Sequence, residues 1–325
     1  MHIPDNYLSP STCVVMGAVM IPIWKKAVVK VKEQLSRKRI PLLGVCAAFS
    51  FLIMMFNVPL PGGTTGHAVG AVLAAILLGP YAATISVTIA LVVQALFFGD
   101  GGILAIGANC FNMAFIMPFT GYYIYKFISK SIKGEKREYI ATFVAGYISL
   151  NIAALFTAVE FGIQPILFKD VAGLPLYCPY GLKVSIPAML IPHLLVAGII
   201  EGVVTAAVYA YVKKISPSTI YEEDSIKMRP FYGLGIAMIF IVPLGLLAAG
   251  TAWGEWDSGE IKDMLGFIPK GMEKGFDFKA IMPDYSIAGL PEIVGYILSA
   301  IAGVVLIIII INFVLRKKSD KNINY

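Results

Sequence analysis

Long apolar segments recur along the chain, and most of the charged residues lie between them. Hydrophobic residues make up 58% of the 325 residues and charged residues only 14%, whereas about a quarter of a soluble domain is charged. An apolar stretch of about 20 residues can cross a bilayer as a helix, and in lipid the backbone must satisfy its own hydrogen bonds. The sequence therefore predicts an all-α, polytopic transmembrane helix bundle.

About nine membrane segments are expected. They cover residues 9–24, 41–58, 67–79, 81–98, 103–127, 139–162, 184–212, 231–250 and 293–315. Basic residues follow the first, fifth and last of these segments, and basic loops stay on the cytoplasmic side. The loop 251–291 instead has more acidic than basic residues. This alternation predicts an N-terminus outside and a C-terminus inside. The net charge of +6 then reflects topology and not nucleic-acid binding.

The basic residues also mark how the chain begins and how it divides. The first of them, Lys25 and Lys26, open a predicted loop that runs to Arg39. A cleavable signal would carry its basic residues before the apolar run, so we expect the terminal amine to remain on Met1. The polar stretch 213–230 is the candidate linker between a membrane domain at 1–212 and a second part at 231–325.

The first two residues, Met1 and His2, can form a chelate. The terminal amine, the His2 main-chain nitrogen and the His2 imidazole close two small rings on one ion. A fourth nitrogen would complete the square plane that is typical of Ni(II) or Cu(II). The alternative is that His2 is a solvated bystander, since chain ends are poorly held in most proteins.

A glycine- and proline-rich stretch leads to a second histidine, His67. Two prolines and three glycines between residues 57 and 67 forbid a regular helix there. Irregular backbone at membrane depth is tolerated where it lines a cavity, and short, broken apolar segments point to a transporter's binding site. The candidate metal ligands are therefore Met1, His2 and His67.

The roles of the other polar groups in the apolar segments stay open. Asp100 either makes a turn or orients a ligating imidazole. Glu160, His193 and Glu201 are candidates for function because ionisable groups at membrane depth are costly. For His193 and Glu201 the alternative is a structural polar contact between helices. The four cysteines have no C-x-x-C spacing, which favours buried, inert thiols over a disulfide frame.

Four stretches of the sequence resemble one family closely. They are MHIPDNYLSP, PGGTTGHAVGAVLAAILLGPYA, FFGDGGILAIGANCFNMAF and PHLLVAGIIEGVVTA. Together they are similar to the CbiM/NikM substrate-capture components of cobalt and nickel energy-coupling factor (ECF) transporters. From about residue 230 on, GTAWGEW and PDYSIAGL resemble the accessory subunit CbiN/NikN in its PDGLE-like form, fused to the same chain.

This resemblance implies a function, partners and a location. The chain would capture and import Ni²⁺ or Co²⁺ as a substrate, bound by Met1, His2 and His67, in the plasma membrane of a prokaryote. It would dock on a CbiQ/NikQ-type membrane subunit driven by CbiO/NikO-type ATPases, and would be neither an enzyme nor a holder of a resident cofactor. The chain itself has no G-x-x-x-x-G-K-[ST] motif for ATP.

Two other classes of function remain as alternatives. A self-sufficient secondary permease for divalent metals would need coupled ionisable groups at mid-membrane, and Glu160, His193 and Glu201 are few for that task. An intramembrane metalloenzyme is disfavoured because the sequence has no H-E-x-x-H and only three histidines.

Overall fold

The structure of the protein is a computed structural model, which describes residues 1–134, 136–220, 227–248 and 250–316. The helices of these residues are α1 (Pro10–Gln34), α2 (Ile40–Met54), α3 (Ala71–Leu78), α4 (Pro80–Val93), α5 (Ile106–Asn109), α6 (Met117–Ser131), α7 (Arg137–Leu167), α8 (Leu182–Pro192), α9 (Gly198–Ile215), α10 (Pro217–Ile220), α11 (Arg229–Ile241), α12 (Ser258–Leu265), α13 (Lys270–Glu273) and α14 (Glu292–Arg316). Strands β1 (Val58–Leu60) and β2 (Thr64–Gly66) form an antiparallel hairpin.

Two less common helix types join or interrupt these elements. π-helical segments lie at Gln94–Phe98, Cys110–Ile116 and His193–Ala197, and 3₁₀ helices lie at Arg37–Arg39, Val242–Leu247 and Pro283–Tyr285. Segments with π-helical turns occur often at functional sites. The first two π-helical segments flank the stretch from residue 99 to residue 105, which contacts the N-terminus.

Six helical stretches of the described chain are long and apolar enough to span a membrane. They are Pro10–Gln34, Pro80–Phe98, Arg137–Leu167, Leu182–Ile215, Arg229–Leu247 and Glu292–Phe313, and the apolar helix Ile40–Met54 is shorter. Each segment predicted from the sequence contains a helix. The polytopic helical membrane fold is thus confirmed, while the number of crossings and the orientation of the termini stay predictions.

The prediction for the first basic loop was wrong in part. Lys25, Lys26, Lys30 and Lys32 lie within α1, which continues past Trp24 to Gln34. Lysine is a good helix former, and its long aliphatic stem can lie along an apolar surface while the ammonium group stays in water. A run of lysines therefore marks the membrane boundary without ending the helix. Residues 221–226 of the predicted linker lie outside the described residues.

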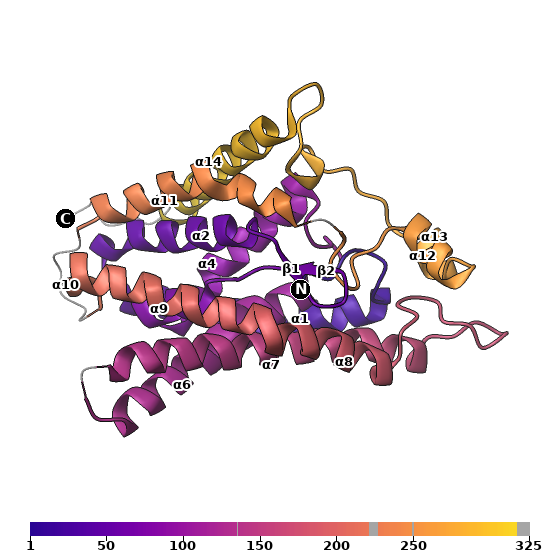
Figure 1. Cartoon of the computed structure of the whole chain (residues 1–325), viewed down its shortest axis with the longest axis horizontal. Coiled ribbons are helices and arrows are strands. Elements are labelled where there is room, and N and C mark those ends of the chain that lie inside the picture. Colours follow the sequence, from indigo (N-terminus) through magenta and orange to yellow (C-terminus); the bar gives the residue numbers. More distant parts are fainter. Residues whose placement is uncertain (135, 221–226, 249, 317–325) are drawn as a thin grey trace, which may run out of the picture.

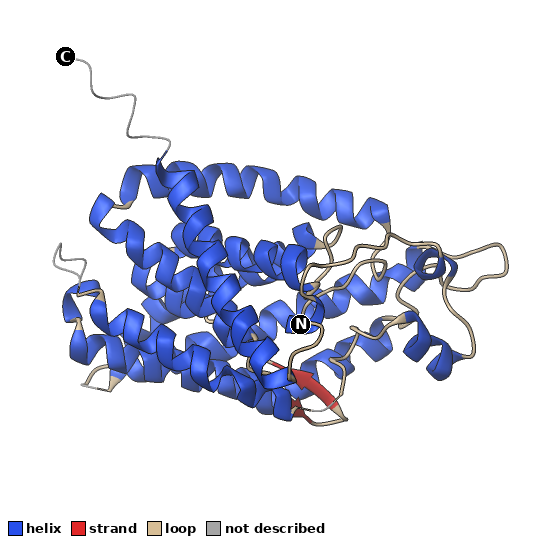
Figure 2. Ribbon diagram, turned by 90° about the horizontal axis from the view of Figure 1, so that it is seen from above, coloured by secondary structure: helices blue, strands red, loops and turns tan. Residues whose placement is uncertain are grey.

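The bundle is elongated, and its two ends differ. At one end, on the right in Figure 1, α12 and α13 lie beyond the helices, and the N-terminus lies inward of them beside the β1–β2 hairpin. The same arrangement appears from above in Figure 2. We call this the site end; it comprises residues 1–9, 58–70, 99–105 and 251–291. The four cysteines are all buried and free, as predicted.

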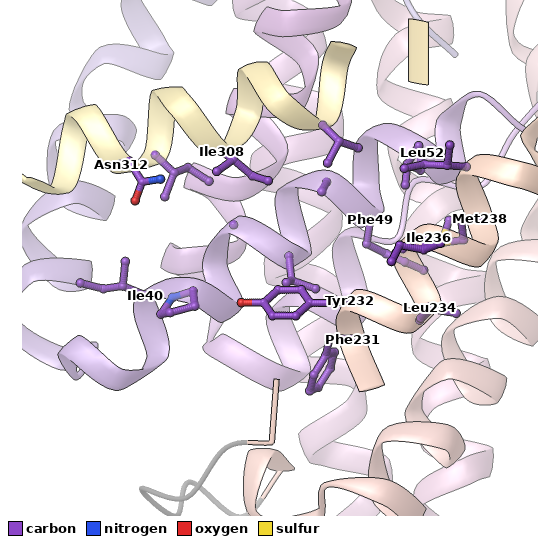
Figure 3. Close-up of a pocket in the computed structure, with 18 residues that line it drawn as sticks. Ile40, Phe49, Leu52, Phe231, Tyr232, Leu234, Ile236, Met238, Ile308 and Asn312 are labelled. Atoms are coloured by element: carbon purple, nitrogen blue, oxygen red, sulfur yellow. The ribbon is translucent and has the colours of Figure 1, made fainter. Parts of the chain in front are cut away.

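The C-terminal region, which we call the accessory part (residues 229–316), packs on the bundle through two helices. α11 and α14 lie against α2. Between these three helices lies an apolar groove of about 420 Å³, with Phe49 and Leu52 on one wall and Ile308 on another (Figure 3). From α11 the chain crosses the site end before it returns in α14, so the accessory part reaches the N-terminus.

Candidate metal centre

The N-terminus is buried, and hydrogen bonds to both the N–H and the carbonyl of Ile3 hold it in place. Met1, His2 and Ile3 are at most 4% exposed. The Ile3 N–H donates to Asn109 Oδ1 (2.8 Å), and the Ile3 carbonyl accepts from Asn109 Nδ2 (3.0 Å) and from the Gly102 N–H (2.8 Å). Burial of this kind replaces the fraying that is usual for a chain end with a single conformation. His2 is therefore no solvated bystander.

The turn after α4 supplies the surface on which the N-terminal segment lies. Asp5 accepts hydrogen bonds from the N–H groups of Ile103 and Leu104. A Cβ on Gly102 would lie 2.5 Å from the Asp5 nitrogen, and Gly101 has a positive φ of 85° beside the His2 ring. Gly102 is needed because it lets the Asp5 backbone approach closely, and Gly101 is needed because glycine adopts the left-handed backbone without strain.

His67 reaches the same place from the hairpin. β1 and β2 turn at Gly62 and Gly63, both with positive φ, and His67 follows β2 directly. The chain stays irregular to Gly70 before α3 begins. Inside the bundle, Glu201 of α9 accepts hydrogen bonds from the N–H of Val69 (2.7 Å) and of Gly70 (3.2 Å). Glu201 thus bridges two segments and fixes the loop that carries His67.

The structure brings the three predicted ligand residues together. The ring centroids of His2 and His67 are 5.0 Å apart, with an interplanar angle of 33°. The Nε2 atoms of both rings are buried and have no hydrogen-bond partner among the described residues. The amine of Met1 forms a 3.2 Å ion pair with Glu255. Unpaired buried nitrogens are costly, and a metal ion is a partner that could satisfy Nε2 of His67.

The second nitrogen of each ring has a partner. His67 Nδ1 lies 3.1 Å from the Ala68 carbonyl, and His2 Nδ1 lies 3.0 Å from Asp100 Oδ1. Asp100 therefore orients the His2 imidazole, which was one of the two roles predicted for it. Asp100 Oδ2 also accepts from Gln94 Nε2 (2.9 Å) and from the Tyr285 hydroxyl (2.5 Å). Metal-ligating histidines are held by outer partners of this kind.

Charges and burial set the protonation of two of these groups. Burial lowers the pKa of His67 well below its ordinary value, and the nearby terminal ammonium and His2 lower it further. Burial alone would raise the pKa of Asp100, but His2 and the Tyr285 hydrogen bond outweigh it and leave that pKa below its ordinary value. His67 is thus held neutral, the form that binds metal, and Asp100 is held as a carboxylate.

The other ionisable candidates do not join this cluster. His193 Nδ1 lies 2.6 Å from the Met189 carbonyl of its own helix, and Glu160 accepts from Asn112 Nδ2 (2.7 Å). His193 does line a very small cavity together with Met1. Within the described chain no group of three or more His, Cys, Asp and Glu side chains could hold a metal. The candidate centre instead combines two imidazoles with nitrogens of the chain terminus.

Sequence reasoning missed the residues that reach this centre from the accessory part. Glu255 and Tyr285 contact the Met1 amine and Asp100 across 254 and 185 residues of sequence. Nothing in their local sequence marks them. The one available signal was general: the loop 251–291 is acidic and follows an apolar span, as expected of a stretch that covers a cation site.

Fold and site together define a class: a polytopic helical membrane protein that buries its own N-terminus beside a loop histidine. Residues 2–219 match the family described as the cobalt uptake substrate-specific transmembrane region, and residues 229–318 match the PDGLE domain. The chain belongs to the first of these families and carries the second domain at its C-terminus. It is a multi-pass membrane protein of a prokaryote, and the resemblance drawn from the sequence is confirmed.

Relatives that match nearly the whole chain include two fused nickel transport proteins. The probable fused nickel transport protein LarMN of Lactiplantibacillus plantarum is 49% identical over 322 residues, with 96% of each chain covered. The fused nickel transport protein NikMN of Rhodobacter capsulatus is 44% identical over 331 residues, with 95% of each chain covered. A crystal structure of a truncated transition metal transporter is 54% identical, with a TM-score of 0.62, and covers 66% of this chain and 99% of that one.

Proposed function

We propose that this protein captures Ni²⁺ or Co²⁺ with high affinity and imports it as the substrate-specific component of an ATP-driven ECF transporter. The observation that carries the proposal is the gathering of Met1, His2 and His67 in one buried cluster, in which two ring nitrogens are unpaired within the described chain. The names of the relatives, which refer to nickel, cobalt and transition-metal transport, support it.

The proposed ligands are four nitrogens: the Met1 amine, the His2 main-chain nitrogen, the His2 imidazole and the His67 imidazole. A chelate ring that includes the His2 main-chain nitrogen can close only through Nδ1 of the imidazole. The other imidazole nitrogen, Nε2, points away from the main chain and cannot reach the same ion. In the structure Nδ1 faces Asp100. Capture therefore includes a turn of the His2 ring about its Cβ–Cγ bond. Binding through a deprotonated amide nitrogen favours Ni²⁺ over Co²⁺.

The site end offers a route for a cation. A cavity of about 390 Å³ lies over the N-terminal segment and is lined by carboxylates of both parts of the chain. They are Asp5, Glu255, Asp257 and Asp277. A concentration of one sign of charge in a cleft raises the local concentration of the opposite ion. We propose that the loop 251–291 of the accessory part gathers cations here. The bound ion would then replace the Met1 ammonium as the partner of Glu255.

The chain would not pump alone. We propose a CbiQ/NikQ-type membrane subunit and CbiO/NikO-type ATPases as partners, since the chain has no P-loop of its own. The N-terminus would lie outside and the C-terminus inside. The chain would divide into a CbiM/NikM-like domain at 1–212, a linker at 213–230 and a CbiN/NikN-like part at 231–325.

Uptake by reconstituted vesicles tests this proposal against a secondary permease. The full chain is reconstituted with and without the coupling subunit and ATPases, and uptake of ⁶³Ni²⁺ is followed with ATP inside and a proton uncoupler present. We expect sustained uptake that needs the ATPases and survives the uncoupler. Uptake without the ATPases that collapses with the uncoupler would establish a secondary permease instead.

A further inference from the structure

A hydrogen-bond network connects the accessory part to the candidate metal centre through one carboxylate. The Tyr285 hydroxyl donates to Asp100 Oδ2 (2.5 Å), and Gln94 Nε2 donates both to that oxygen (2.9 Å) and to the Tyr285 oxygen (2.8 Å). The other oxygen of Asp100 lies 3.0 Å from His2 Nδ1. A residue of the accessory part thus lies one side chain away from a proposed metal ligand.

The backbone and the packing both force Tyr285 into this position. Asp284 and Tyr285 have positive φ angles of 52° and 58°, a region that non-glycine residues seldom occupy. The Tyr285 ring stacks on Phe98 at 4.8 Å and is 7% exposed, and its carbonyl accepts from Ser299 Oγ at 2.9 Å. Unfavourable backbone conformations persist where the surroundings over-determine them, and they gather at functional sites.

Asp100 lies beside one edge of the His2 ring. In the structure it accepts from Nδ1. Half a turn about Cβ–Cγ exchanges Nδ1 with Cδ2 and places Nε2 on the ring edge that faces Asp100, beyond Cδ2. A small rotation of the Asp100 side chain then makes the carboxylate the acceptor for the Nε2 N–H, while Nδ1 is turned away to bind metal. The two donors to Oδ2 keep the carboxylate on this side of the ring.

We propose that Tyr285 is a positioning residue of the metal site: through Asp100 it fixes the ring of His2, so that the site is complete only with the accessory part in place. This inference rests on the proposed role of His2 as a ligand. Removing an outer partner of a ligating histidine lowers metal affinity by about 10- to 100-fold. Because Gln94 still donates to Asp100, we expect Tyr285→Phe to give about the lower of these two values.

The test compares purified full-length variants in detergent. Ni²⁺ affinity is measured by calorimetry, and the ligand geometry is read from the EPR spectrum of the Cu²⁺-loaded protein. Tyr285→Phe should lower the affinity about tenfold and alter the EPR parameters. The control is Tyr296→Phe, which removes a hydroxyl from a neighbouring buried tyrosine that donates to the Met55 carbonyl. Its affinity and spectrum should match those of the wild type.

A double-mutant cycle shows whether Tyr285 acts through Asp100. In an Asp100→Ala background, Tyr285→Phe should cause no further loss. An undiminished loss in that background would overturn the inference, and so would Tyr285→Phe with wild-type affinity and spectrum. Gln94→Leu removes the other donor to Oδ2 and should shift both readouts in the same direction. It serves as the deciding variant if Tyr285→Phe does not fold, and wild-type behaviour would then overturn the inference.

A third variant separates this inference from the proposed function. One alanine inserted between Met1 and His2 breaks the chelate and leaves the Tyr285–Asp100 pair untouched. If the insertion abolishes tight binding while Tyr285→Phe has no effect, the inference about Tyr285 fails alone. If the insertion leaves binding intact, the proposed ligand set fails.

Discussion

Glu201→Gln tests whether the loop that carries His67 must be held from inside the bundle. Glu201 is fully buried, and its two oxygens accept hydrogen bonds from the N–H groups of Val69 and Gly70. Glutamine keeps the shape but replaces one acceptor oxygen with an NH₂ group, which faces donors. An NH₂ group in the place of Oε2 faces the Val69 N–H, and one in the place of Oε1 faces the Gly70 N–H, which keeps only its bond to the other oxygen. Either way a buried hydrogen bond is lost or weakened, at a cost of about 1–3 kcal/mol.

The size of the loss in Ni²⁺ affinity depends on which conformation of the loop the substitution destabilises. The affected N–H belongs to a residue two or three positions after His67, so the cost falls on the loop conformation that places His67 in the site. At 1.4 kcal/mol for each factor of ten, the Ni²⁺ affinity should fall by roughly 5- to 150-fold. Calorimetric titration of the purified full chain measures it, with thermal unfolding of the metal-free protein recorded in parallel.

Glu160→Gln is the matched control for Glu201→Gln. Glu160 is also a buried glutamate of a long helix, but it bonds to Asn112 Nδ2 and not to the chain after His67. We expect its affinity to stay within a factor of two of the wild type. Wild-type affinity in Glu201→Gln, or an equal loss in both variants, would refute the assignment of Glu201 to the His67 loop.

Four further predictions concern protons and the N-terminal segment. Affinity should fall as the pH is lowered from about 8 to 5, because binding displaces protons from the amine and the amide; unchanged affinity would exclude these ligands. The pKa of His67 already lies well below its ordinary 6.5, so this ring carries no proton to release near pH 7. His67→Ala should therefore weaken binding without altering the dependence of log affinity on pH there, as calorimetry at several pH values will show. Gly102→Ala should weaken binding and lower the melting temperature, because its Cβ would lie 2.5 Å from the Asp5 nitrogen, whereas Gly233→Ala has open space and should do neither. Asn109→Ala removes both hydrogen bonds to Ile3, at a cost of about 1–3 kcal/mol, and should raise hydrogen exchange at residues 1–5; unchanged exchange would contradict the anchoring role.

Local chemistry explains which features could be predicted from the sequence. Apolar runs of sufficient length become helices because lipid leaves the backbone no other partner, and each expected segment contains one. The Gly/Pro-rich stretch before His67 forms an irregular hairpin because proline and glycine exclude helix. The chelating potential of Met1 and His2 depends only on their covalent structure. These features require no knowledge of tertiary packing.

Long-range packing decides the rest. The contact between Glu201 and Val69 spans 132 residues, and the contacts of Glu255 and Tyr285 span more. A carboxylate in an apolar helix signals that a partner exists but does not say which one. His193 and Glu201 illustrate this: a polar contact between helices was one expectation for both, yet His193 bonds to its own helix and Glu201 to the His67 loop.

The central claim is that the N-terminal amine and His2 bind the transported ion. The most direct measurement is Ni²⁺ and Co²⁺ binding by two purified full-length forms: the native chain, and the chain with one alanine inserted between Met1 and His2. The insertion keeps every side chain but breaks the two-ring chelate. We expect tight binding to disappear with the insertion. Binding that survives undiminished would contradict the claim and direct attention to His193, which lines a small cavity beside Met1.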